Sequence, residues 1–76
     1  MADQITISPD PVERGKAATI HYNGTNPQTL TVTWFPGGSS TVTTDADGNV
    51  TVTAPDNADT VKVTGGTAPG LSTIVI

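Results

Sequence analysis

The sequence predicts an all-β domain, either a two-layer β-sandwich or a small barrel, with seven short strands. Valine, isoleucine and leucine alternate with threonine in short runs, which is the period of a half-buried strand. Clusters of glycine, proline, asparagine and aspartate separate these runs at intervals of roughly 8–12 residues. No long stretch repeats its apolar residues at the helical period.

The first half of the chain contains three predicted strands. The strand at Ile5–Ser8 stops at Pro9–Pro11, which suits an edge strand or a bend because proline donates no ladder hydrogen bond. Strands at Ala17–Asn23 and Leu30–Phe35 follow, with a loop rich in glycine and asparagine between them. Trp34 is the largest apolar side chain, so we expect it at the centre of the core.

The stretch Ser40–Ala54 is typical of a β-hairpin with one apolar face and one threonine face. Val42 lies on its first arm and Val50 and Val52 on its second, and threonine alternates with them. Asp47-Gly48 between the arms is a strong turn signal, because glycine tolerates a positive φ. Two further strands, Thr60–Thr64 and Leu71–Ile76, complete the set of seven.

Alternation assigns one side of each strand to the core. The predicted inward residues are Ile5, Ile7, Ala18, Ile20, Tyr22, Leu30, Val32, Trp34, Val42, Val50, Val52, Val61, Val63, Ile74 and Ile76. The last strand is apolar on both sides, so it is expected either as a buried strand or as an edge that pairs with another chain.

Composition excludes several classes of protein. The 76 residues suit a single domain, residues 1–76, and the absence of cysteine excludes disulfides and thiolate metal sites. A net charge of −4 with only three lysines and arginines argues against nucleic acid or an anionic membrane as partner. The N-terminus lacks the features of a signal peptide, and no apolar run approaches the roughly 20 residues of a membrane helix.

Three features of the chain resemble immunoglobulin-like domains of bacteria and bacteriophages. They are the opening I-T-I-S-P-D-P-V-E-R-G-K-A-A-T-I, the tryptophan on the third strand (Trp34), and the segment T-T-D-A-D-G-N-V-T-V-T-A-P. The resemblance implies a seven-stranded immunoglobulin-like β-sandwich. The chain departs from antibody-type domains, because it has no cysteines for the intersheet disulfide and no tyrosine in the sixth strand.

Reaction chemistry has little support in the sequence. His21 is the only histidine; it falls on an outward face among threonines, and no G-x-S-x-G motif accompanies it, so we expect a surface residue and no enzyme. Asp45 and Asp47 resemble part of a calcium loop. Aligned on Gly48, however, two key carboxylates of that loop are missing, so a turn is expected there and no metal or cofactor is predicted.

The candidate contact surface is Phe35-Pro36-Gly37 together with a terminal strand that ends at Ile76. Phe35 should face away from the core beside a flexible loop, where an exposed aromatic ring can contact a protein. The alternative is that Phe35 packs beneath a neighbouring loop or has no role.

Two classes of function remain open. A chain that starts at methionine and has neither a secretion signal nor a cysteine suits a tailed-phage virion protein, made in the host cytoplasm, that decorates a repetitive capsid or tail shell. Assembly into homo-oligomers is compatible with this role. The alternative is a spacer or carbohydrate-binding module within an extracellular bacterial adhesin or hydrolase.

Overall fold

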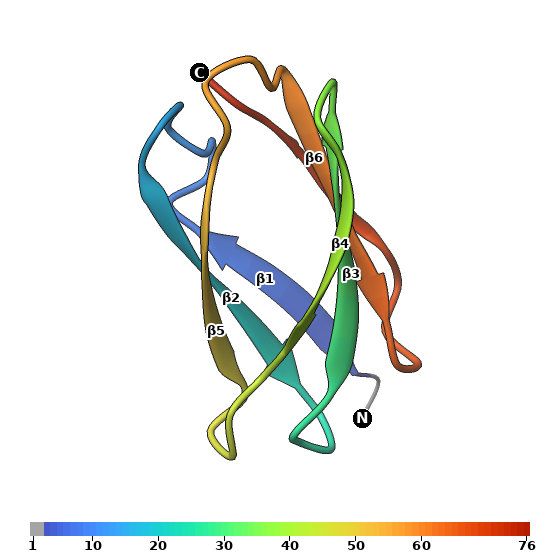
Figure 1. Cartoon of the computed structure of the whole chain (residues 1–76). Helices are drawn as coiled ribbons and strands as arrows, with labels where there is room; N and C mark the ends of the chain where they lie inside the picture. Colours follow the sequence, from blue (N-terminus) through green and yellow to red (C-terminus); the bar gives the residue numbers. More distant parts are fainter. Residues whose placement is uncertain (1–2) are drawn as a thin grey trace.

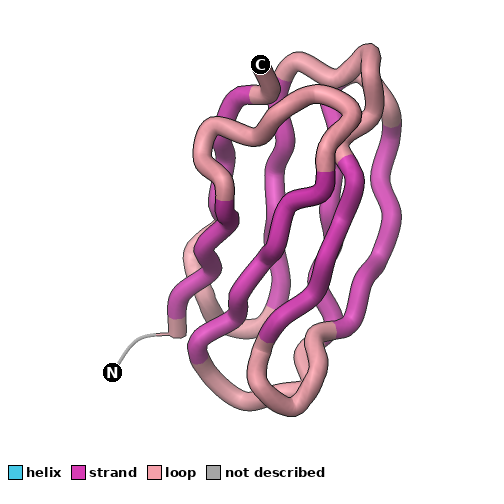
Figure 2. The backbone as a smooth tube through the Cα atoms, turned by 90° about the vertical axis from the view of Figure 1, so that its left-hand side faces the viewer, coloured by secondary structure: helices cyan, strands magenta, loops and turns pink. Residues whose placement is uncertain are grey.

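The computed structural model describes residues 3–76, and this part of the chain is all β (Figures 1 and 2). The strands are β1 (Gln4–Ser8), β2 (Ala17–Asn23), β3 (Thr29–Phe35), β4 (Gly38–Thr43), β5 (Asn49–Thr53), β6 (Thr60–Gly65) and β7 (Leu71–Ile74). They lie close to the predicted runs, because each run alternates apolar residues with threonine or serine. No helix in residues 3–76 is long and apolar enough to cross a membrane.

The strands form two antiparallel sheets packed face to face (Figure 1). One sheet has the order β1-β2-β5 and the other the order β4-β3-β6-β7. The predicted all-β sandwich without disulfides is therefore confirmed. Two open sheets with distinct edge strands also exclude the small barrel that the sequence left as an alternative.

The predicted hairpin at Ser40–Ala54 is wrong. β4 pairs with β3 and β5 pairs with β2, so the two arms belong to different sheets. The turn between them does form, with the backbone N–H of Asp45 donating to the Asn49 carbonyl at 3.0 Å. The arms then diverge, because each has a longer partner strand with which its valines face the core.

The end of the chain pairs with the segment that follows β1. Val12 bridges Val75 in parallel, and Val12 N–H donates to the Ile74 carbonyl at 3.0 Å. Ile76 N–H donates to the Val12 carbonyl at 2.8 Å, and Arg14 N–H donates to the Ile76 carbonyl at 2.7 Å. These bonds occupy the outer backbone groups of residues 74–76, so that part of the edge is closed to another strand.

The core contains most of the predicted inward residues. The buried apolar side chains are Ile5, Ile7, Val12, Ala18, Ile20, Tyr22, Leu30, Val32, Trp34, Ala54, Ala58, Val61, Val63 and Val75. Val42, Val50 and Val52 are partly buried against them. Trp34 is buried but lies one residue from the end of β3, so the core centres on fully buried side chains in the middle of strands, such as Ile20 and Val32.

The predicted orientation of the last strand is wrong by one residue. Val75 is buried, whereas Ile74 and Ile76 are exposed. A run that is apolar on both sides carries no alternation signal, and the pairing of Val75 with Val12 sets which side faces the core.

Candidate functional site

Phe35 is the last residue of β3 and projects from the outer face of the four-stranded sheet. It follows buried Trp34, so strand alternation directs its ring outward, as predicted. Asp59 N–H donates to the Phe35 carbonyl at 2.8 Å, which fixes the strand end. Pro36-Gly37 then forms the tight connection to β4, and both residues are exposed.

Strand register brings Ile74 beside Phe35. Phe35 pairs with Thr60 of β6, and Thr60 pairs with Ile74 of β7, so the two apolar side chains flank one threonine. A shallow hollow of about 300 Å³ lies between them, lined by Phe35, Thr60, Val61, Lys62, Ser72, Thr73 and Ile74.

Three large apolar side chains are exposed in residues 3–76, and all three lie at one end of the sandwich. Phe35 is 49% exposed, Ile74 54% and Ile76 58%. The chain reaches this end at the close of β3, and its C-terminus lies there too (Figure 1). We call the surface formed by Phe35, Ile74 and Ile76 the apolar end.

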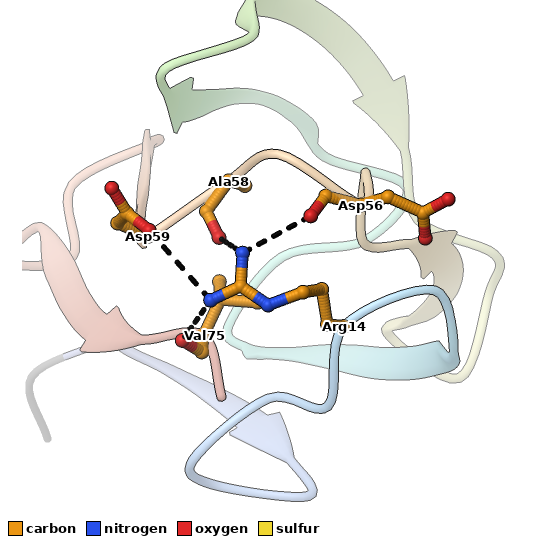
Figure 3. A network of polar contacts seen from close by, with 5 residues as sticks. All are labelled: Arg14, Asp56, Ala58, Asp59 and Val75. Carbon is orange, nitrogen blue, oxygen red and sulfur yellow. Dashed lines mark hydrogen bonds and ion pairs between the residues drawn. The ribbon is translucent and has the colours of Figure 1, made fainter.

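Arg14 braces the loops at the apolar end (Figure 3). Its Nη1 donates to the carbonyls of Asp56 at 3.1 Å and Ala58 at 2.5 Å, and its Nη2 donates to the carbonyl of Val75 at 3.2 Å. Nη2 also lies 3.6 Å from Asp59 Oδ1. One guanidinium thus joins three segments that are distant in sequence, so the exposed apolar side chains stand on a fixed frame.

The opposite end of the sandwich carries a cluster of polar side chains, Asp3, Tyr22 and Thr67, which we call the polar end. Asp3 Oδ2 accepts from Thr67 Oγ1 at 2.6 Å and from the Tyr22 hydroxyl at 2.7 Å. Thr67 N–H donates to the Tyr22 hydroxyl oxygen at 3.1 Å. The bond from Thr67, and then that from Tyr22, lowers the pKa of Asp3, because both stabilise the carboxylate.

His21 and the aspartates of the predicted turn, Asp45 and Asp47, lie away from the apolar end. His21 Nδ1 is 2.8 Å from Asn49 Oδ1 on the outer face of the three-stranded sheet. Asp45 Oδ1 accepts from the N–H groups of Asp47 at 2.9 Å and Asn49 at 3.0 Å, the bonding of an aspartate in a turn. Within residues 3–76, no three histidine or acidic side chains are grouped to hold a metal ion.

The structure brings Phe35, Pro36, Gly37 and Ile76 to one end of the molecule. Sequence reasoning missed Ile74, which it assigned to the core, and it missed Thr60 and Lys62 beside the hollow. Alternation in β6 already places Thr60 and Lys62 outward, opposite buried Val61 and Val63. Their proximity to Phe35 required the pairing of β6 with β3, which local sequence does not specify.

No protein-family model, curated protein or solved structure matches the chain.

Proposed function

We propose that this chain is a non-enzymatic structural and interaction protein of the immunoglobulin-like class, which attaches to a protein surface through its apolar end. The observation that carries the proposal is the gathering of Phe35, Ile74 and Ile76 at one end, each about half exposed. Single exposed apolar residues are common, whereas a group of them marks an interaction site. The Arg14 brace supports the same role, because a rigid surface loses little entropy on binding.

The size of this surface indicates weak attachment by each copy. Covering the exposed halves of three large apolar side chains stabilises a contact by about 3 kcal/mol in total, at about 1 kcal/mol each. Association costs at least about 4 kcal/mol in lost translational and rotational freedom, so further contacts or several linked copies are needed.

A repetitive partner satisfies this requirement. Within the immunoglobulin-like class we therefore favour a tailed-phage virion protein, made in the host cytoplasm, that decorates a capsid or tail shell. Many equivalent sites on one particle allow weak contacts to add up. Support for the immunoglobulin-like class comes from the opening segment and from Trp34, whereas the threonine-rich segment around Asp47-Gly48 resembles such domains of bacterial surface proteins.

One observation favours a spacer module of a bacterial surface protein as the second candidate. The sandwich is elongated, with extents of 34 × 19 × 18 Å, and its described N-terminal end and C-terminus lie at opposite ends (Figure 1). Domains joined end to end in a long fibre need this placement of the termini. In that setting the apolar end would contact the next domain of the same chain.

Intact-mass spectrometry of the protein from its natural source separates the two candidates. A decoration protein is expected at about the 7.7 kDa of this chain and bound to purified particles. A spacer module is expected within a much longer polypeptide, and that mass would overturn the virion proposal.

Co-sedimentation with those particles then tests the surface. The double variant Phe35→Thr/Ile74→Thr replaces both side chains with the residue that dominates this face, and it should remain in the supernatant. Thr19→Ala, on the outer face of the other sheet, is the control and should sediment like the wild type. Unchanged sedimentation of the double variant would reject the apolar end as the attachment surface.

A further inference from the structure

The hollow beside Phe35 has the size and lining for one side chain of a partner. Its volume of about 300 Å³ lies at the lower limit of small-molecule pockets, and it is open to solvent. Phe35 and Ile74 form apolar walls on either side of Thr60. A large apolar side chain can therefore enter between the walls and leave its own backbone outside.

Lys62 gives the hollow a charge. It is exposed two residues along β6 from Thr60, on the same face of the strand and roughly 6.6 Å away. Its strand neighbours are Thr33 and Ser72, and the single ion pair within residues 3–76 joins Arg14 and Asp59 elsewhere. Lys62 therefore has no acidic partner in the described part of the chain.

Lys62 is also the one charged residue on the outer face of the four-stranded sheet. The other outward positions of that face are Thr29, Thr31, Thr33, Phe35, Ser39, Thr41, Thr43, Thr60, Thr64, Ser72 and Ile74. The chain as a whole carries seven acidic residues and three lysines and arginines. A lone cation beside an apolar hollow on an acidic protein is complementary to a carboxylate that lies next to an apolar side chain.

We propose that the hollow binds a segment of a partner protein that presents one large apolar side chain with an aspartate or glutamate two residues away. The apolar side chain lies between Phe35 and Ile74, and the carboxylate pairs with Lys62 Nζ. Two residues of an extended segment span the same distance as Thr60 to Lys62. This inference deepens the proposed attachment function and depends on it.

A second copy of this chain fits the hollow less well. Two copies that each carry a net charge of −4 repel one another. Two acidic residues near the apolar end are already engaged, since Asp59 lies beside Arg14 and Asp10 accepts from Thr73 Oγ1. A self-contact therefore has fewer free carboxylates to offer Lys62.

An array of immobilised heptapeptides tests the inference with a defined probe. Each peptide consists of glycine and serine with a central leucine and with Glu, Gln or Lys two positions away. The protein is coupled in many copies, through its N-terminal end opposite the apolar end, to fluorescent beads, so that weak single contacts add up. We expect wild-type beads to bind the Glu peptide more strongly than the Gln peptide, by up to about fivefold for each contact, the difference that an exposed ion pair provides.

Charge-reversal variants locate the origin of that preference. Lys62→Glu should reverse it, so that the Lys peptide binds best. Lys16→Glu changes the net charge equally but lies in the β1–β2 connection, and it should keep the preference for Glu. Equal effects of the two variants, or no binding of any peptide by the wild type, would overturn the inference.

The apolar variant separates failure of this inference from failure of the proposed function. If Phe35→Thr/Ile74→Thr loses peptide binding while Lys62→Glu leaves the charge preference unchanged, the apolar end is an attachment surface and the acidic partner is wrong. If the double variant still binds the peptides and the particles, the attachment surface itself is wrong. A wild-type dimer in sedimentation equilibrium that Ile74→Thr dissociates would assign the hollow to a second copy and overturn the inference.

Discussion

The two ends of the sandwich differ in the surface that their side chains present to solvent. At the polar end, Asp3, Tyr22 and Thr67 bond to one another, and the hydroxyl of Tyr22 both donates and accepts. At the apolar end, Arg14 satisfies three backbone carbonyls, while Phe35 and its two apolar neighbours stay uncovered. Both ends have their loops fixed by hydrogen bonds, and only one presents apolar surface to solvent.

This difference separates stability from contact. The hydrogen bonds of Arg14 at one end, and those of Asp3 with Tyr22 and Thr67 at the other, join segments that are distant in sequence and so stabilise the fold. The uncovered apolar side chains stabilise it less, because about half of each faces water. Substitutions in the bonded clusters should therefore lower stability, and substitutions in the uncovered surface should mainly affect binding.

The largest effect is expected from Gly66→Ala at the polar end. Gly66 has φ +56°, and an added Cβ would clash with the Tyr22 hydroxyl oxygen. The expected loss is about 3 kcal/mol in the free energy of unfolding, about 1 from the left-handed backbone and about 2 from displacing the bonded hydroxyl. Gly38→Ala is the matched control, since Gly38 has φ +86° with nothing within 4 Å, and it should lose only about 1 kcal/mol. Urea denaturation measures both, and equal losses would show that the Tyr22 cluster contributes little.

A loss of about 2 kcal/mol is expected from Arg14→Met at the apolar end, because charged donors to several carbonyls contribute about that much. Methionine keeps the length of the side chain and removes its donors. Lys16→Met is the control, and a residue this exposed should change the free energy of unfolding by less than about 0.5 kcal/mol. Similar thermal unfolding of the two variants would contradict the bracing role of Arg14.

The bounds of the strands could be predicted from the sequence better than the pairing between strands. Alternation of valine and isoleucine with threonine is a local signal, so β2 and β3 were predicted close to their observed bounds. Asp47-Gly48 specified a turn, but the same alternation on either side suits a hairpin or a crossing between sheets. Only the pairing of β5 with β2 decides between them, and that depends on residues about 30 positions apart.

The apolar end was predicted in part for the same reason. Phe35 follows a clear alternating run, so its exposure could be read locally. Ile74 lies in a run that is apolar on both sides, and its orientation depends on the pairing of Val12 with Val75. Val12 and Ala58 were missed as core residues because they lie outside the strands, where alternation gives no information.

A smaller effect is expected from replacing the uncovered side chains themselves. Phe35→Thr and Ile74→Thr should each lower the free energy of unfolding by no more than about 1 kcal/mol, because only half of each side chain leaves water on folding. Threonine also suits an exposed strand position, and Thr60 lies between the two. Denaturant titration checks this, and a loss close to that of Gly66→Ala would place these side chains in the core.

The smallest effect is expected from the charge of Asp3, and this effect is lost in acid. The hydrogen bond from Thr67, followed by that from Tyr22, lowers the pKa of Asp3 in the folded protein. A lowered pKa means that the carboxylate stabilises the fold above its ordinary pKa of about 3.9, and that this stabilisation is lost as the pH falls through the lower folded value. Asp3→Asn should therefore unfold more easily than the wild type at pH 7, and the difference should shrink below about pH 4. Thr67→Val removes the main cause of the lowered pKa and should weaken the dependence of stability on acid. If the difference in unfolding between Asp3→Asn and the wild type stays constant from pH 7 to acid, Asp3 does not act through its charge.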